Sequence, residues 1–132
     1  MAKKVLLADD DPVSRLVMRA ALEQLGLEIV AAESGPEAVS AMLWDRFDII
    51  VTDLIMPKVD GWEVIRYARE TQKQARIVAV SGGLAQRLDP DRALEVAHMV
   101  GADITLLKPV TPAQLQAEVN QLLSKPHPAH AA

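Results

Sequence analysis

The stretch from Asp48 to Gly61 constrains the fold more than any other part of the sequence. It begins with a short β-branched run, Ile49-Ile50-Val51, that is apolar throughout. Such a run suits a strand that is covered on both faces, as the strands of a parallel sheet are. The run stops at Asp53, and Pro57 followed by Asp60-Gly61 predicts a loop. A central parallel strand would therefore deliver Asp53 to its carboxyl edge, where open α/β sheets place their ligands.

Apolar runs of strand length alternate along the whole chain with stripes of helical spacing. The predicted strands cover residues 5–8, 27–32, 49–51, 76–80 and 104–107. The predicted helices begin at Pro12, at Pro36, at Gly61, after Asp89-Pro90 and at Thr111-Pro112. Proline is favoured in the first turn of a helix, because its missing N–H has no intrahelical partner there.

Five strands alternating with five helices predict an α/β fold, in which a parallel sheet carries helices on both faces. Right-handed crossovers leave few topologies, and the flavodoxin-like strand order 2-1-3-4-5 is the usual one. In that order the crevice between strands 1 and 3 is the predicted site. The carboxyl ends of strands 1, 3, 4 and 5 carry Asp9-Asp10, Asp53, Ser81 and Lys108, and these side chains are predicted to converge.

The totals fit one globular domain and argue against several classes of protein. With 132 residues, half of them apolar, the chain is long enough to bury a core. Its net charge of −4 argues against nucleic acid or an anionic membrane as a direct partner. The absence of cysteine excludes disulfides and thiolate metal sites and fits a reducing cytoplasm. The start of the chain supports neither a signal peptide nor a membrane span.

Three carboxylates within a few ångströms repel one another, since two unit charges 4 Å apart cost about 4 kcal/mol at an effective dielectric near 20. Such a cluster usually means a bound cation or a proton held at raised pKa. Oxygen ligands alone favour a hard cation, Mg²⁺ or Mn²⁺. The ammonium of Lys108 and the hydroxyl of Ser81 would hold the remaining oxygens of a phosphoryl group. In this position Asp53 can act as a nucleophile that forms an acyl phosphate.

Four motifs, taken in order, resemble the receiver domain of two-component response regulators. They are Val5-Leu-Leu-Ala-Asp-Asp-Asp-Pro12, Val51-Thr-Asp-Leu-Ile-Met-Pro-Lys-Val-Asp-Gly61, Val80-Ser-Gly82, and Gly101-Ala-Asp103 with Lys108-Pro109. Each motif alone is weak, but all four at family spacing are highly specific. The match spans residues 3 to about 124.

The resemblance implies that Asp53 accepts a phosphoryl group from a histidine kinase or a histidine phosphotransfer protein. It implies that Asp10 binds Mg²⁺ directly and that Asp9 acts mainly through a water. Asp53 and the backbone carbonyl of Ile55 would complete the protein's share of the coordination. The chain would catalyse only its own phosphorylation and dephosphorylation, with no metabolic substrate.

The same resemblance implies that Lys108 pairs with the phosphoryl group and that Lys108–Pro109 is a cis peptide. Ser81 would move toward the phosphate and carry the signal outward. Two features depart from the family. Thr105 stands where an aromatic residue often reports activation, and the connection 81–91 is several residues longer than usual. A substitute switch is therefore expected in that connection, which holds two glycines.

The expected protein is a single-domain, cytoplasmic response regulator, a monomer or weak dimer. Residues 1–124 would form the receiver domain and residues 125–132 a flexible tail. The tail is too short for a DNA-binding or enzymatic output domain, so output is expected through a downstream protein or onward phosphotransfer. The start at Met1 argues against an amino-terminal extension, although a fragment of a hybrid kinase or larger regulator would look the same.

Two other functions compete with this one. The first is a Mg²⁺-dependent phosphohydrolase of the haloacid-dehalogenase type, which needs a second Asp where this chain has Ile55. The second is a receiver-like binding module that signals without phosphorylation, which a degenerate acidic cluster would favour.

Several other residues have simple structural interpretations. Asp11 is predicted to cap the helix that begins at Pro12. Asp60-Gly61 is interpreted as turn chemistry without a catalytic role. Arg66, Arg69 and Lys73 are interpreted as a solvated face of the third helix.

Overall fold

Five parallel strands form the sheet in the computed structural model of the protein, in the order β2-β1-β3-β4-β5. The strands are β1 (Lys4–Ala8), β2 (Glu28–Ala32), β3 (Ile49–Asp53), β4 (Arg76–Ser81) and β5 (Ile104–Leu107). The structure describes residues 2–54, 56, 61–81, 95, 98–99 and 101–125, without the side chain of Ser81. The predicted α/β class and strand order are confirmed.

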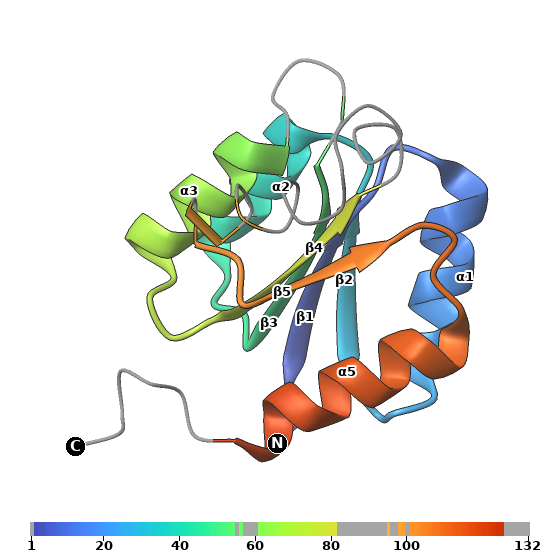
Figure 1. Ribbon diagram of the computed structural model, residues 1–132. Helices are drawn as coiled ribbons and strands as arrows, with labels where there is room; N and C mark the ends of the chain where they lie inside the picture. Colours follow the sequence, from blue (N-terminus) through green and yellow to red (C-terminus); the bar gives the residue numbers. More distant parts are fainter. Residues whose placement is uncertain are drawn as a thin grey trace.

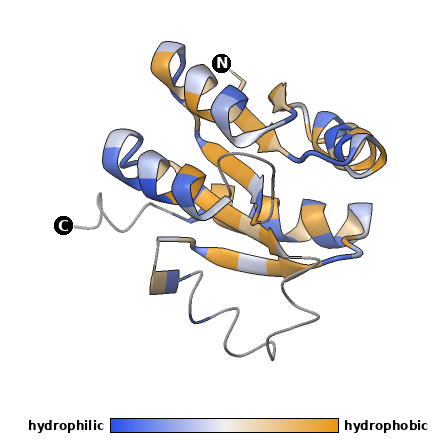
Figure 2. Cartoon of the chain, turned by 90° about the horizontal axis from the view of Figure 1, so that it is seen from above, coloured by the Kyte–Doolittle hydropathy of each residue, from blue (hydrophilic) through white to orange (hydrophobic). Residues whose placement is uncertain are grey.

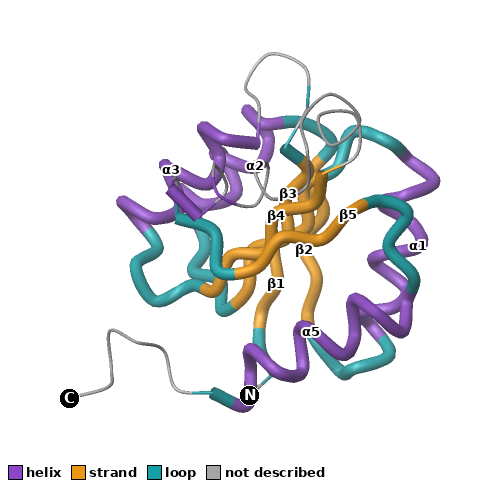
Figure 3. Tube along the Cα trace, viewed as in Figure 1, coloured by secondary structure: helices purple, strands orange, loops and turns teal. Residues whose placement is uncertain are grey.

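Helices cover both faces of the sheet, as Figures 1 and 3 show. They are α1 (Pro12–Glu23), α2 (Gly35–Trp44), α3 (Gly61–Thr71) and α5 (Pro112–Ser124). On one face lie α1 and α5, and on the other α2 and α3. The helix predicted after Asp89-Pro90 falls almost entirely outside the described residues. Within the described part of the chain, none of the helices combines the length and the apolar character that a membrane span requires.

Side-chain caps fix the starts of the helices that carry proline in the first turn. Asp11, Ser34 and Thr111 each accept a hydrogen bond from a backbone N–H two or three residues further on. Such a cap contributes about 1 kcal/mol to helix stability. The predicted cap at Asp11 is confirmed, and it fixes the direction in which the chain leaves β1.

Alternate residues of the strands pack against opposite helix layers. Leu6 and Ile50 face α2 and α3, whereas Leu7 and Val51 face α1 and α5. Figure 2 shows the apolar sheet between the two helix layers. Each large side chain that becomes fully buried contributes roughly 1.5–3 kcal/mol. Odd-numbered positions of β1 and β3 thus point toward α1 and α5.

Arg69 ties three segments together near the amino edge of the sheet. Its Nε and Nη2 donate to the carbonyl of Gly101 at 3.1 and 2.9 Å, and its Nη1 donates to the carbonyl of Ala75 at 3.1 Å. Its Nη2 also pairs with Asp103 at 3.0 Å. The expectation of a solvated face is therefore wrong for Arg69, because its planar fork of donors meets backbone carbonyls.

Candidate functional site

The register of β1 and β3 brings Asp9 and Asp53 together. Ala8 pairs with Thr52, so the next step along both strands sets Asp9 beside Asp53, one strand spacing or about 4.8 Å apart. Both occupy odd-numbered positions and so point to the same side of the sheet. Asp9 is 0% exposed and Asp53 only 6%. The sheet therefore holds two carboxylates in a largely dry setting.

Asp10 completes a cluster of three carboxylates. One oxygen from each of Asp9, Asp10 and Asp53 lies within 4.8 Å of the others, and Asp10 is exposed. A donor set made only of oxygens suits a hard divalent cation that keeps some of its waters. The exposed third carboxylate gives such an ion access from solvent. The chemistry of the cluster therefore fits Mg²⁺ or Mn²⁺.

Lys108 lies between the two buried carboxylates. Its Nζ is 2.9 Å from Oδ2 of Asp53 and 3.2 Å from Oδ2 of Asp9. Burial alone would lower the pKa of Lys108, but the hydrogen bond to Asp53 and the charges of both carboxylates outweigh it and raise that pKa above its usual 10.5. The ammonium is thus charged at neutral pH. The Lys108–Pro109 peptide is cis, as the resemblance implied.

Arg15 supports Asp9 from the first turns of α1, a role that the sequence did not indicate. Its Nη1 donates to the backbone carbonyl of Asp9 at 2.8 Å, and its Nη2 lies 3.7 Å from Glu33. The N–H of Asp11 donates to Oδ1 of Asp9 at 3.0 Å. Arg15 lies four residues, about one helical turn, after the cap Asp11, so its side chain lies on the same face of α1 as the end of β1. This spacing could have indicated the contact from the sequence.

Gly61 supports Asp53 through its lack of a side chain. A Cβ at position 61 would overlap the carbonyl oxygen of Asp53 and lie 2.7 Å from its carbonyl carbon. The N–H of Gly61 also donates to the carbonyl of Leu54 at 3.0 Å. The interpretation of this residue as turn chemistry is therefore incomplete, because glycine lets α3 begin against the backbone of Asp53.

The other predicted site residues are only partly visible. Ser81 ends β4 opposite Leu107, but its side chain, like Ile55 and the connection 82–91, lies outside the described residues. Thr105 pairs with Ala79 in the sheet. Its Oγ1 is buried and makes no hydrogen bond with any residue that the structure describes. The predicted movement of Ser81 and the substitute switch expected in the connection 81–91 thus stay predictions.

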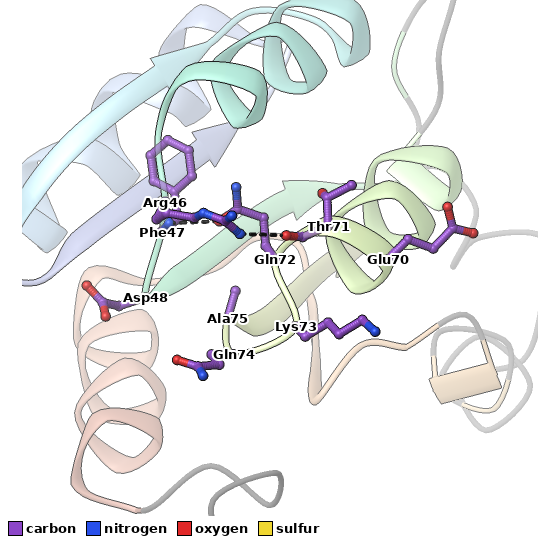
Figure 4. Close-up of a pocket in the computed structure, with 9 residues that line it drawn as sticks. All are labelled: Arg46, Phe47, Asp48, Glu70, Thr71, Gln72, Lys73, Gln74 and Ala75. Atoms are coloured by element: carbon purple, nitrogen blue, oxygen red, sulfur yellow. Dashed lines mark hydrogen bonds between the residues drawn. The ribbon is translucent and has the colours of Figure 1, made fainter.

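A hollow of about 560 Å³ lies at the opposite edge of the sheet, before β3 and β4 (Figure 4). Arg46 and Gln72 line it, and both side chains bind backbone groups there. Arg46 donates to the carbonyl of Thr71 at 2.8 Å, and Gln72 accepts from the N–H of Phe47 at 2.9 Å. These groups hold loops together, so the converging carboxylates are the better candidate for chemistry.

Comparison with known proteins gives the family. Residues 5–120 match the response regulator receiver domain. The sensor protein EvgS of Escherichia coli O157:H7 is 31% identical over 123 residues, 93% of this chain and 10% of the relative. The probable transcriptional regulator ycf27 of Cyanophora paradoxa is 32% identical over 124 residues, 93% of this chain and 49% of the relative. The chain thus spans half or less of the length of these relatives.

A shorter relative and two solved structures agree. The response regulator receiver protein CpdR of Brucella abortus (strain 2308) is 34% identical over 89 residues, 67% of this chain and 74% of the relative. Chemotaxis response regulator CheY4 of Vibrio cholerae has a TM-score of 0.82 at 27% identity, covering 92% of this chain and 99% of its own.

The receiver domain of sensor histidine kinase PA1611 from Pseudomonas aeruginosa PAO1, solved with a magnesium ion in its active site cleft, has a TM-score of 0.80. Its identity is 29%, covering 95% of this chain and all of its own. The chain therefore belongs to the response regulator receiver domains of two-component signalling systems.

Proposed function

We propose that the protein is a phosphorylation-dependent signalling switch that accepts a phosphoryl group on Asp53. The observation that supports this best is the 2.9 Å hydrogen bond from Lys108 to Asp53 inside a cluster of three carboxylates. An ammonium in that place can neutralise charge on a transferring phosphoryl group. The switch itself then follows from the new charge and acceptors that the phosphoryl group brings.

In the proposed reaction an oxygen of Asp53 attacks the phosphorus of a phosphohistidine and an acyl phosphate forms. The P–N bond breaks, and its electron pair stays on the imidazole nitrogen. Asp10 would hold Mg²⁺ directly, Asp9 through a water, and Ile55 through its backbone carbonyl. Bound Mg²⁺ supplies neutralisation of the phosphoryl oxygens. Lys108 would pair with those oxygens, so catalysis comes mostly from positioning and charge.

The donor in this proposal is a histidine kinase or a histidine phosphotransfer protein. The similarity to a sensor protein and to transcriptional regulators supports that pathway class. The outer face of α1, next to Asp9, supports docking of such a donor. There Val13 and Leu16 are each 69% exposed and Val17 is 41% exposed, an apolar surface at helical spacing.

The output in this proposal is contact with a downstream protein or onward phosphotransfer. Ser81 and Thr105 would form the switch, within a receiver domain that covers 1–124. The buried Oγ1 of Thr105 has no hydrogen bond within the described part of the chain, so a rearrangement that gives it a partner would be favoured. The flexible tail at 125–132 and the cytoplasmic location stay predictions.

The test is intact-mass analysis after incubation with acetyl phosphate and Mg²⁺. Wild type should gain one phosphoryl-sized increment, and Asp53→Asn should gain none. Omitting Mg²⁺, or changing Asp10→Asn, should suppress the increment. Glu37→Gln is a matched control and should keep the increment, because it removes an exposed carboxylate of the first turn of α2 that lies outside the cluster.

The absence of an increment in wild type, also with a phosphorylated histidine donor, would contradict the proposal. The fold would stand, and a phosphorylation-independent interaction module would become the better interpretation.

A further inference from the structure

The groove between α2 and α3 presents apolar side chains to solvent, on the side of the sheet away from α1. On α2, Leu43 is 65% and Trp44 85% exposed. Two hollows lie along the groove. Val39 lines one of about 360 Å³ and Leu43 lines one of about 240 Å³, and Tyr67 of α3 lines both. The groove, defined by Val39, Leu43, Trp44 and Tyr67, is therefore centred at the level of Tyr67.

The α3 side of this groove carries alternating charge. Glu63, Arg66 and Glu70 are exposed at spacings of three and four residues, so they lie on one face of the helix. No ion pair joins Arg66 to Glu70, although they are one turn apart, and neither has another ion-pair partner in the described part of the chain. In Figure 4 the Glu70 side chain extends away from the protein. The α2 wall of the groove is thus apolar. The α3 wall is charged, and there the positive charge of Arg66 and the negative charge of Glu70 cancel.

We propose that this groove binds a second copy of the chain across a two-fold axis that crosses α2 at the level of Ala41 and α3 at the level of Ala68, next to Tyr67. Such an axis sets each helix antiparallel to its own copy, and every contact occurs twice. On α2, Leu43 then lies opposite Val39 of the second copy. On α3, Arg66 lies opposite Glu70 of the second copy. Apolar side chains meet apolar ones, and Arg66 and Glu70 each meet a side chain of opposite charge.

Charge favours a second copy as the occupant. The chain carries a net charge of −4, which makes most pairs of its surfaces repel each other. At the groove, Arg66 and Glu70 are four residues apart. Antiparallel two-fold symmetry therefore places Arg66 of each copy opposite Glu70 of the other, which makes two pairs of opposite charge. The alternative interpretation is a solvated helix face whose charges contribute little to stability or to association. That interpretation leaves the exposure of Trp44 and Leu43 unexplained.

The first experiment is sedimentation equilibrium of the unphosphorylated chain across a wide range of protein concentrations. Wild type should move from monomer toward dimer as concentration rises. Leu43→Glu should weaken the association about tenfold or more, because it removes an apolar contact that occurs twice. Leu16→Glu is the matched control, since Leu16 is a leucine of similar exposure, 69%, on α1, and it should leave the association unchanged.

The second experiment reverses the charges. Arg66→Glu alone and Glu70→Arg alone should each weaken self-association, because each places like charges opposite one another twice. The double variant R66E/E70R should restore it. A mixture of the two single variants should also associate, because each carries the charges that the other needs. These exchanged positions are exposed, and circular dichroism checks that each variant keeps its fold.

Three results would overturn the proposal. Wild type that stays monomeric at every concentration shows that no second copy binds. A dimer that Leu16→Glu disrupts and Leu43→Glu does not shows a contact elsewhere. Failure of both the double variant and the mixture to regain association shows that Arg66 and Glu70 do not face each other. None of these outcomes depends on phosphorylation, so the proposed switch is tested separately.

Discussion

At the amino edge of the sheet, both the amide nitrogen and the amide oxygen of Gln72 bind backbone groups, whereas at the carboxyl edge two buried carboxylates, Asp9 and Asp53, share Lys108. Nε2 of Gln72 donates to the carbonyls of Asp45 and Met42 at 2.8 and 3.2 Å, and its Oε1 accepts from the N–H of Phe47. This side chain is only 4% exposed. At the amino edge, a buried polar side chain thus holds neighbouring loops together through hydrogen bonds to their backbone.

The carboxyl edge uses buried polarity differently. Asp9 and Asp53 are buried with one ammonium between them, and Asp10 adds a third negative charge. Like charges at this distance oppose folding. The comparison teaches that this sheet is stabilised by buried polar groups at one edge and keeps an excess of negative charge at the other.

The largest effect on stability is expected from Gly61→Ala, which adds a Cβ where the backbone of Asp53 stands. We expect the free energy of unfolding to fall by about 3 kcal/mol, because the added Cβ clashes with backbone atoms, which cannot move aside as a flexible side chain could. Phosphorylation should slow as well, because Asp53 is displaced. Urea unfolding and intact-mass kinetics measure the two.

Gly26→Ala is the control for this change. Gly26 has φ +77°, and an added Cβ meets nothing within 4 Å, so that variant should cost about 1 kcal/mol and leave phosphorylation unchanged. Equal losses for the two variants would show that the contact with Asp53 does not matter.

Gln72→Leu tests the amino edge in the same way. It should cost about 2 kcal/mol, because it leaves buried backbone groups at Asp45 and Phe47 without partners. Phosphorylation of Asp53 should be unaffected, since the change lies at the far edge. Gln74→Leu, at an exposed position of the same turn, should change neither quantity. A slower phosphorylation in the Gln72 variant would show that the two edges are coupled.

A smaller effect concerns pH. The pKa of Lys108 is raised above 10.5 in the folded chain, so its ammonium contributes stability that is fully present below pH 10.5. That contribution is lost as pH rises through the higher folded pKa. The difference in unfolding free energy between wild type and Lys108→Met should therefore shrink only above pH 10.5. A difference that already shrinks between pH 7 and pH 9 would contradict this assignment.

The smallest effect is expected from Thr105→Val, and it has the opposite sign. Oγ1 of Thr105 is buried without a hydrogen bond to any of the described residues, so its removal should stabilise the unphosphorylated chain by about 1 kcal/mol. The stabilisation should be smaller in the presence of beryllofluoride if the hydroxyl gains a partner on activation. Thermal unfolding with and without the phosphate analogue measures both, and equal gains would remove Thr105 from the switch.

Local patterns predicted most of the fold. The predicted helix start at Gly61 and the predicted strand 104–107 match α3 and β5, because helical spacing and short apolar runs are properties of neighbouring residues. The convergence of Asp9, Asp53 and Lys108 followed from parallel strands whose carboxyl ends share one edge. The sequence therefore predicted the elements and the outline of the site.

What the sequence did not reveal are contacts between distant segments. Arg69 looked like any charge on a helix face, but its partner Asp103 is 34 residues away. Gln72 and Phe47 are 25 residues apart. The backbone of Asp53 occupies the position that a Cβ at Gly61 would need. No local periodicity encodes these partners, and they exist only once the layers have packed.

The distance along the chain between Lys108 and Asp9 has a consequence for synthesis. These two residues are 99 positions apart, and β5, just before Lys108, emerges from a ribosome after the other four strands of the sheet. A nascent chain that ends before it carries the paired carboxylates without their ammonium. Such an incomplete chain should therefore lack the ammonium that the proposed phosphoryl transfer requires. Under the proposed function, phosphorylation of Asp53 would thus report completion of the five-stranded sheet.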